Sequence, residues 1–218
     1  MEQRGKSRGA QRQDHGVQSS GGAGKLYVVA TPIGNLGDIS ARALAVLAQA
    51  DLIAAEHTRT TGNLLAHHGI SAKLIALHEH NEAQRAAELV ARIVAGKSIA
   101  LVSDAGTPGI SDPGALLVAQ ARQAGVVVCP IPGANAAIAA LSASGLVSAR
   151  FLFYGFLPAK AAARLAALEA LREHACALVF YEAPHRVMEC VAALAGVLGG
   201  ERDIVIAREL TKLFETIH

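Results

Sequence analysis

The sequence predicts an α/β fold, in which short strands alternate with helices and the strands form a parallel sheet. Two observations lead to this prediction. Apolar strand-like runs and helix-like segments follow one another from Lys25 onward. Their regular alternation is typical of a parallel sheet with helices on both faces. Three loops rich in glycine and proline directly follow strands, at residues 31–38, 103–114 and 132–136.

The strand-like runs of the first part of the chain are short, apolar and bounded by turn residues, as expected of buried parallel strands. They are residues 26–31, 52–55, 74–77, 98–102 and 126–131. The longest of the three loops reads Ser-Asp-Ala-Gly-Thr-Pro-Gly-Ile-Ser-Asp-Pro-Gly after the run that ends at Val102. An abrupt change from apolar to turn residues marks the end of a strand and the start of a loop.

Between these strands we expect helices over residues 40–50, 60–68, 81–96, 114–125 and 135–144. Ser40 can cap the first of them, and Gly69 suits the position just after the end of the second. Asn81 with Gln84 resembles a capping box at the start of the third. Gly125 ends the fourth, and Pro-Gly-Ala-Asn at residues 132–135 leads into the last, which is rich in alanine.

The composition changes near residues 145–151, where an aromatic strand over 151–156 begins. Further helices are expected over residues 160–173 and 185–198, with strands over 177–181 and 204–207. We therefore divide the chain into an N-terminal domain of residues 25–147 and a C-terminal domain of residues 148–218. Residues 1–24 are polar and should be disordered, because they cannot bury enough apolar surface to offset their loss of conformational entropy.

Composition excludes several classes of protein. No apolar run approaches the roughly 18–20 residues of a membrane span, and the N-terminus lacks the apolar centre of a signal peptide. The odd number of widely spaced cysteines, three in all, favours a reducing cytoplasm over a disulfide framework. Five of the 20 basic and two of the 18 acidic residues fall within residues 1–25, so the remainder carries a net charge of −1. That balance gives no sign of a strongly basic nucleic-acid surface.

The motifs of several common enzymes are absent from the sequence. No G-x-G-x-x-G follows the first strand, which argues against a nicotinamide-dependent dehydrogenase, and no G-x-S-x-G suggests a serine hydrolase. His78 and His80 could face one way on a strand, but without a spaced third ligand we expect no metal site. The three strand-end loops remain, and ligands of open α/β sheets bind at that edge. Glycines there let backbone approach a small cofactor closely.

Five segments carry a resemblance to a known family. Residues 26–38, 55–59, 103–114, 180–186 and 207–212 are similar to motifs of the tetrapyrrole (corrin/porphyrin) methylase superfamily, in the same order along residues 25–218. The resemblance is strongest to the branch that methylates the ribose 2′-hydroxyl of a decoding-centre cytidine in 16S rRNA. It implies two α/β domains of the tetrapyrrole-methylase type, the first a mostly parallel sheet with helices on both faces. It also implies S-adenosyl-L-methionine in the cleft between them.

The same resemblance implies the surroundings in which the protein works. The partners would be 16S rRNA in the 30S subunit and a second copy of the chain in a homodimer, with no membrane and no DNA, in the cytoplasm. Two features depart from the family pattern. His57 stands where the family usually has Asp, and family members continue for several dozen residues beyond His218. The C-terminal domain is therefore expected to be incomplete.

The resemblance also implies roles for individual residues. The cofactor-binding residues would be Pro32, Asp104, Gly106, Thr107, Ile110, Asn135, Ala136 and Leu210. From the chemistry of methyl transfer to a hydroxyl, the candidates for accepting or orienting its proton are Glu56, Asp104, Glu182, His185 and Glu209. The residues placed to hold RNA phosphates are Arg59, Arg186, Arg208 and Lys212. Glu182 and Arg186 are four residues apart and could instead pair with each other.

Two alternatives stay open from the sequence. The first is a methylase of a small tetrapyrrole acid, which shares the fold and the cofactor but not the substrate. The second is a non-catalytic cofactor-binding module whose incomplete second domain has lost activity. The motifs Ala55-Glu-His-Thr-Arg59 and Ala207-Arg-Glu-Leu-Thr-Lys212 favour RNA over a tetrapyrrole as the methyl acceptor.

Overall fold

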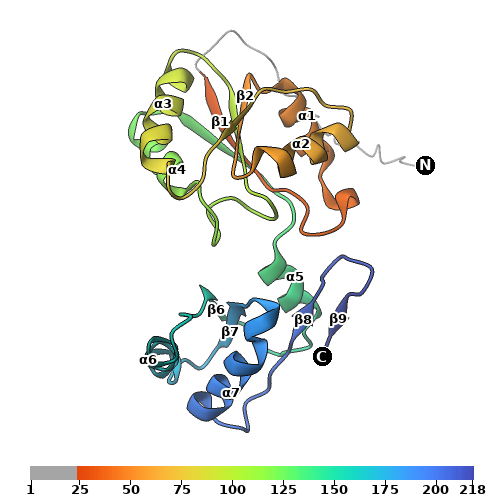
Figure 1. The fold of residues 1–218 in the computed structure, drawn as a ribbon, viewed down its shortest axis with the longest axis vertical. Coiled ribbons are helices and arrows are strands. Elements are labelled where there is room, and N and C mark those ends of the chain that lie inside the picture. Colours follow the sequence, from red (N-terminus) through yellow and green to blue (C-terminus); the bar gives the residue numbers. More distant parts are fainter. Residues whose placement is uncertain (1–23) are drawn as a thin grey trace, which may run out of the picture.

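A computed structural model describes residues 24–218. The disorder expected for residues 1–24 therefore concerns residues that, apart from Gly24, lie outside the described part of the chain. Five parallel strands form the main sheet in the order β3-β2-β4-β1-β5 (Figure 1). Their bounds are β1 Lys25–Val29, β2 Leu52–Ala55, β3 Leu74–Ala76, β4 Ile99–Val102 and β5 Val127–Ile131. The predicted α/β fold with a parallel sheet is confirmed.

Two helices cover each face of this sheet, as Figure 1 shows. The four are α1 Ala41–Gln49, α2 Thr58–His67, α3 Glu82–Val94 and α4 Ala115–Gln123. Helices α1 and α2 contribute Leu47 and Leu65 to one apolar cluster. Helices α3 and α4 contribute Leu89 and Leu117 to the cluster on the opposite face. The sheet is thus buried between two helical layers.

Strand β4 lies in the middle of the sheet and is buried on both faces. Ile99 and Leu101 belong to the α3–α4 side, whereas Ala100 and Val102 belong to the α1–α2 side, and all four residues are at most 1% exposed. A strand with both faces covered has no solvent side that would favour polar residues. This explains why its sequence is uniformly apolar.

The second part of the chain is smaller and contains two short sheets. After α5 Ala136–Ala143, the parallel strands β6 Phe151–Phe156 and β7 Ala177–Tyr181 pair with each other. Around them lie α6 Ala161–Leu171, a 3-10 turn at Pro184–Arg186 and α7 Val187–Leu198. Leu157, Leu168, Cys190 and Val197 form a third buried cluster. None of the helices within residues 24–218 is long and apolar enough to cross a membrane.

The strand predicted over residues 204–207 is wrong. The regular strand is β8 Ala207–Arg208, and it pairs antiparallel with β9 Thr216–Ile217. Before it, Ile206 exchanges two backbone hydrogen bonds with His218, at 2.8 and 3.1 Å. The pairing partner is a stretch of a few residues close to the end of the sequence. A segment this short is too brief to show the alternating or apolar pattern by which a strand is recognised in a sequence.

The capping box predicted at Asn81 and Gln84 is also wrong. The side chain of Asn81 does not cap α3. Its Oδ1 instead accepts a hydrogen bond from the backbone N–H of His78 at 2.9 Å, and its Nδ2 donates to the carbonyl of Ala76 at 3.3 Å. Asn and Asp side chains often bond to nearby backbone in turns, and this competes with capping. Asn81 therefore closes the turn between β3 and α3.

Glu82, the first residue of α3, caps the neighbouring helix. Its Oε1 accepts hydrogen bonds from the backbone N–H groups of Gly114, Leu116 and Leu117, at 3.0, 2.9 and 3.3 Å. The first N–H groups of a helix have no partner within the helix, and a negative charge there also interacts favourably with the helix dipole. One carboxylate thus fixes the start of α4, and with it the end of the loop 103–114.

Replacement of this carboxylate should destabilise the fold measurably. We expect Glu82→Ala to lower the free energy of unfolding by about 1–2 kcal/mol, since it leaves the start of α4 without its cap. Urea denaturation followed by circular dichroism would measure the change. Glu79→Ala, at an exposed position just before α3, is the matched control and should stay close to the wild type. Equal stability of the two variants would contradict the capping role.

Candidate functional site

The parallel sheet brings four chain segments together at one edge. The carboxyl ends of β1, β2, β4 and β5 all point the same way, so the loops that follow them meet there. Thr31 and Gly106 form an isolated bridge, with N–H···O distances of 2.8 and 3.0 Å between the segments after β1 and β4. The hydroxyl of Thr31 also donates to the carbonyl of Ser103 at 3.1 Å. These bonds hold the two loops as one surface.

The loop 103–114 has a backbone that only glycine adopts easily at several positions. Gly106 and Gly109 have φ values of 80° and 79°, in the left-handed region. The hydroxyl of Thr107 donates to the carbonyl of Ala134 at 3.2 Å and thereby ties this loop to the one after β5. Ser111 has a φ of 62°, which is uncommon for a residue with a side chain. The turn itself therefore favours glycine at these two positions.

A large pocket of about 1150 Å³ opens beside this loop. Six of the eight residues predicted to bind the cofactor lie in its lining, and they come from three separate segments of the chain. These six are Gly106, Thr107, Ile110, Asn135, Ala136 and Leu210. The other two, Pro32 and Asp104, line a second pocket of about 260 Å³, together with residues of α2. The two pockets meet along the backbone of residues 32–33 and 104–105.

The small pocket is lined mainly by polar side chains. Helix α2 supplies Thr60, Thr61 and Asn63, and the strand ends supply Thr31, Ser103 and Asp104. Pro32, Leu36 and Leu64 complete the wall. Such a lining offers many hydrogen-bonding groups in a narrow space, which suits a small polar group of a ligand.

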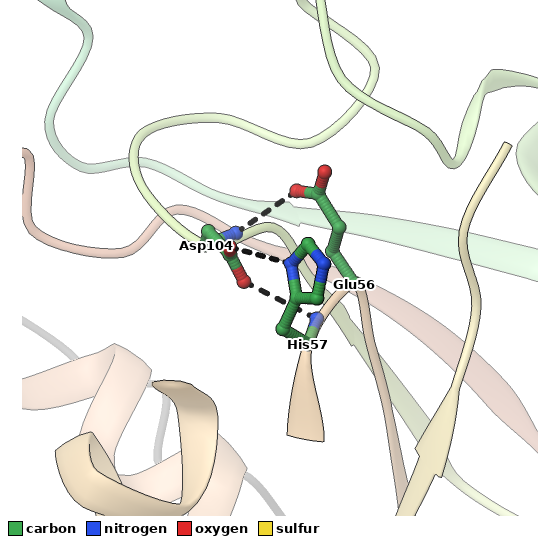
Figure 2. Close-up of side chains that lie close together, drawn as sticks. All are labelled: Glu56, His57 and Asp104. Carbon is green, nitrogen blue, oxygen red and sulfur yellow. Dashed lines mark hydrogen bonds and ion pairs between the residues drawn. The ribbon is translucent and has the colours of Figure 1, made fainter. Parts of the chain in front are cut away.

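Glu56, His57 and Asp104 form a cluster at the edge of the sheet (Figure 2). The Nδ1 atom of His57 lies 2.7 Å from Oδ2 of Asp104, and the backbone N–H of His57 donates to Oδ1 of the same carboxylate at 3.2 Å. The backbone N–H of Asp104 donates to Oε2 of Glu56 at 3.3 Å. The side chain of His57 is 64% exposed. The imidazole is therefore oriented on one side and accessible on the other.

Asp112 adds a third carboxylate to this region. Burial, together with the nearby negative charges of Glu56 and Asp104, raises the pKa of Asp112 to about 6. Asp112 lines the large pocket. Carboxyl groups with raised pKa values gather at sites where a ligand or proton transfer matters.

The other predicted proton acceptors lie in the second part of the chain. Glu182 pairs with Arg186 at 3.2 Å, with side chains 10% and 21% exposed, and Arg186 also donates to the carbonyl of Leu157 at 2.8 Å. Glu209 pairs with Lys212 at 3.3 Å. The ion pair that the four-residue spacing of Glu182 and Arg186 suggested is present. The guanidinium of Arg186 therefore binds groups of this chain.

The loop that carries Glu209 touches the loop after β1. A Cβ atom on Gly34 would lie 2.5 Å from Cγ of Lys212, so glycine is required for this close approach. Glu209 and Thr211 have φ values of 54° and 67°, in the region that residues with side chains rarely adopt. Arg59 and Arg208 are exposed. Of the other predicted RNA-binding residues, Lys212 is also exposed, whereas Arg186 is only partly exposed.

Sequence reasoning did not assign a role to two residues that the structure places in the site. His57 was noted only for its departure from the family pattern, and its contact with Asp104 joins positions 47 residues apart. Asp112 lies in the recognised loop, but its raised pKa depends on its burial in the fold and on the charge of Glu56 from another segment. Only the fold brings these groups together.

Comparison with known proteins gives a consistent result. A family model described as Tetrapyrrole (Corrin/Porphyrin) Methylases matches residues 25–218. A Vibrio cholerae protein named ribosomal RNA small subunit methyltransferase I is 61% identical over 196 residues, which is 90% of this chain and 68% of that protein. A protein of the same name from Escherichia coli O157:H7 is 57% identical over 89% of this chain and 68% of its own length.

Solved structures share the fold at low sequence identity. A cobalt precorrin-4 methyltransferase superposes with a TM-score of 0.66 at 18% identity, covering 93% of this chain and 87% of that one. A diphthine synthase gives a TM-score of 0.63 at 18% identity, with coverages of 88% and 80%. At this level of identity the likeness concerns the fold alone.

The raised pKa of Asp112 leads to a prediction about stability and pH. Because its pKa is about 6 in the folded protein, against an ordinary value of 3.8, the folded state holds the proton more tightly than the unfolded chain. Stability should therefore fall as pH rises from about 4 to about 6. Asp112→Asn should remove this pH-dependent loss of stability, because asparagine does not ionise. Above pH 6 the variant should be more stable than the wild type, by on the order of 1 kcal/mol once solvent screening is included.

Urea denaturation at pH 4.5 and pH 7.5 would test this expectation. The stability difference between Asp112→Asn and the wild type should be larger at pH 7.5. Asp203→Asn, at an exposed carboxylate, serves as the control. A difference that is the same at both pH values would contradict the assignment.

Proposed function

The chain belongs to the tetrapyrrole methylase family, and from this membership we propose that it methylates the ribose 2′-hydroxyl of a decoding-centre cytidine in 16S rRNA. The observation that carries the proposal is the identity of 57–61%, over about nine tenths of the chain, to relatives named ribosomal RNA small subunit methyltransferase I. The chain is accordingly a methyltransferase that acts on ribosomal RNA. The choice of the cytidine and of its 2′-hydroxyl follows the resemblance of the five motifs.

The residues of the large pocket fit S-adenosyl-L-methionine as the methyl donor. The pocket exceeds the range of about 300–1,000 Å³ that is typical of small-molecule sites, so it has room for the donor. Gly106 leaves the loop surface without a side chain, and a Cβ atom there would already touch Ile33 at 3.5 Å. When bound, the sulfonium supplies a methyl group that is activated for transfer. We propose that Thr107, Ile110 and Asn135 hold it.

The protein then has two tasks. It must hold the hydroxyl oxygen in line with the methyl group, and it must take the hydroxyl proton away. Asp104 lines the small pocket and its backbone N–H donates to Glu56, which supports a part for these two carboxylates in the second task. Glu182 lines the large pocket, but its carboxylate is paired with Arg186. Glu209 is paired with Lys212.

RNA would approach over the exposed basic residues near these loops. Arg59, in the first turn of α2, follows the Glu56–His57 segment directly, and Arg208 precedes Glu209. Basic side chains of this kind position a nucleic acid through its phosphates and carry no sequence information themselves. We propose 16S rRNA in the 30S subunit as the partner.

We also propose that two copies of the chain form a homodimer in the cytoplasm. Each copy would consist of an N-terminal domain of residues 25–147 and a C-terminal domain of residues 148–218. Support for an interface comes from large apolar side chains that the single chain leaves exposed near the junction of the two sheets. They include Ile138, Val147, Phe151 and Phe156, with exposed fractions of 50% or more. Large exposed apolar groups of this kind often mark contact surfaces.

A tetrapyrrole methylase is the second candidate function. The observation in its favour is the fold shared with a cobalt precorrin-4 methyltransferase. A third candidate, a module that binds the cofactor without catalysis, would bind the donor but transfer methyl to neither substrate. Methyl-acceptor assays separate the three.

Binding of the methyl donor should depend on the loop after β4. Isothermal titration should show one site per chain, and Thr107→Trp should abolish the heat, because the indole would fill the space beside the Ala134 carbonyl that Thr107 contacts. Val94→Trp, at a position 63% exposed on α3 and outside the pocket lining, should bind normally. Unchanged binding by Thr107→Trp would overturn the pocket assignment.

Methyl transfer should require RNA. With 30S subunits from cells that lack this modification, the chain and the donor should produce a stop in primer extension at low dNTP, which reports ribose methylation. Arg59→Ala should reduce transfer several-fold at low salt without changing affinity for the donor, because the loss is a phosphate contact, and the deficit should shrink as salt rises. Transfer to a uroporphyrinogen-type acid, with none to 16S rRNA, would decide for the tetrapyrrole candidate.

A further inference from the structure

We propose that His57 is the catalytic residue that takes the proton from the acceptor hydroxyl, and that Asp104 is the positioning residue that orients its imidazole. The inference deepens the proposed function and rests on it. It also assigns a role to the small pocket beside this pair, where the ribose of the acceptor nucleotide would lie.

The contacts of His57 fix which nitrogen is available. Asp104 accepts from the backbone N–H of His57 through one carboxylate oxygen and lies 2.7 Å from Nδ1 through the other. An ionised carboxylate can only accept hydrogen bonds, so this contact favours the tautomer with the proton on Nδ1. The lone pair of the neutral ring then resides on Nε2. Orientation of an imidazole by a carboxylate in this way is a recurrent arrangement in proton-transfer sites.

Asp104 is itself held in place. Its backbone N–H donates to Oε2 of Glu56 at 3.3 Å, and it directly follows Ser103, whose carbonyl accepts from the hydroxyl of Thr31. The carboxylate therefore extends from a segment that is fixed at the end of β4. An oriented acceptor needs a rigid support of this kind, because small displacements cost much of the rate.

The carboxylates considered from the sequence are each engaged with a donor in the described part of the chain. Glu56 accepts from the Asp104 backbone, Asp104 binds His57, and the other two form ion pairs with Arg186 and Lys212. In contrast, Nε2 of His57 belongs to a side chain that is 64% exposed. Among these five groups, the imidazole of His57 has the atom that is best placed to receive a proton from a ligand.

Asp104, the partner of His57, lies at the boundary of the two pockets. Asp104 lines the small pocket, whereas the next residue, Ala105, lines the large one. At about 260 Å³, the small pocket admits a sugar or a single nucleoside but not a tetrapyrrole macrocycle. Its threonine, serine and asparagine side chains suit the hydroxyl groups of a ribose.

The reaction balances with these groups. The hydroxyl oxygen forms a bond to the methyl carbon, and the carbon–sulfur bond breaks with its electron pair remaining on sulfur. The hydroxyl proton passes to Nε2 of His57. The imidazolium that forms is stabilised by the Asp104 carboxylate and later releases the proton to water. No metal, oxidant or further reactant is required.

The pH dependence follows from the groups that face the imidazole. Asp104 contacts it directly, Glu56 binds the Asp104 backbone, and Asp112 is close enough to both carboxylates for their charges to raise its pKa. Arg59, in the first turn of α2, lies two residues after His57 in the sequence. A protonated imidazole has no free lone pair on Nε2 and cannot accept the hydroxyl proton. The rate of methyl transfer should therefore fall towards acidic pH.

The test compares single-turnover methylation of 30S subunits by the full chain and its variants between pH 5.5 and 9. We expect His57→Gln to lower the rate by about 10²–10⁴-fold, the usual contribution of a general base, and to lose the acidic limb of the profile. His57→Asp should restore part of the rate with the limb displaced to lower pH. Titration calorimetry should give donor affinities within twofold of the wild type. His67→Gln, at the exposed end of α2, is the matched control.

A double-mutant cycle tests the positioning role of Asp104. Asp104→Asn should reduce the rate, and the double variant should be no slower than His57→Gln alone, because residues that act as a unit are not additive. Wild-type rates in His57→Gln, or loss of donor binding in that variant, would overturn the proposal. Dependence of the wild-type rate on an added divalent ion, with loss in EDTA, would assign the cluster to a metal instead. If the wild-type chain binds the donor but methylates no RNA, the proposed function fails first, and the role of His57 falls with it.

Discussion

The parallel pairing of β4 with β1 on one side and β2 on the other is the constraint on which the rest of the structure depends. Residues 99–102 are buried on both faces, and their register with Leu26–Val28 and with Leu52–Ala55 aligns the carboxyl ends of all three strands. Because the strands end at one edge, Thr31, Glu56 and Asp104 become neighbours although they are far apart in sequence. A slip of the register by one residue would turn the apolar side chains of β4 to the wrong face and would separate these groups.

The electrostatics of this edge are unfavourable in the absence of a ligand, which indicates a functional origin. Three carboxylates gather there, and the raised pKa of Asp112 reflects the cost of burying it and of placing it near Glu56 and Asp104. A fold selected for stability alone has little reason to hold these groups together. The contact of Asp104 with His57 offsets part of the repulsion when the ring is protonated. The arrangement is therefore poised to hold a positive charge or to accept a proton, as a reaction that releases a proton requires.

The sequence sufficed for the alternation of strands and helices, the parallel sheet and the loops at its edge, because these depend on local patterns. It failed where a polar side chain had more than one local hydrogen-bonding partner to choose from, and where a short segment paired with another part of the chain. Asn81 bonds to the turn before it instead of capping α3, and Ile206 pairs with His218, whose neighbours carry no strand pattern. The contact between His57 and Asp104 could not be predicted, because the two residues follow different strands. Conversely, the motif resemblance led to Gly106, Thr107 and Asn135, which share one pocket in the structure.

The strained backbone of the molecule occurs where its two parts meet. In the described chain the residues other than glycine with positive φ are Ser111, Glu209 and Thr211. Ser111 lies against β6, where a Cβ atom on Gly155 would be 2.8 Å from its hydroxyl, and Thr211 lies 3.1 Å from the corresponding position on Gly34. Strain of this kind persists only where surrounding contacts impose it. The two glycines permit the close approach, and the strained residues shape the loops around the large pocket. The contact between the two parts of the chain is thus built into the site itself, so a change that separates them should impair donor binding before it unfolds either sheet.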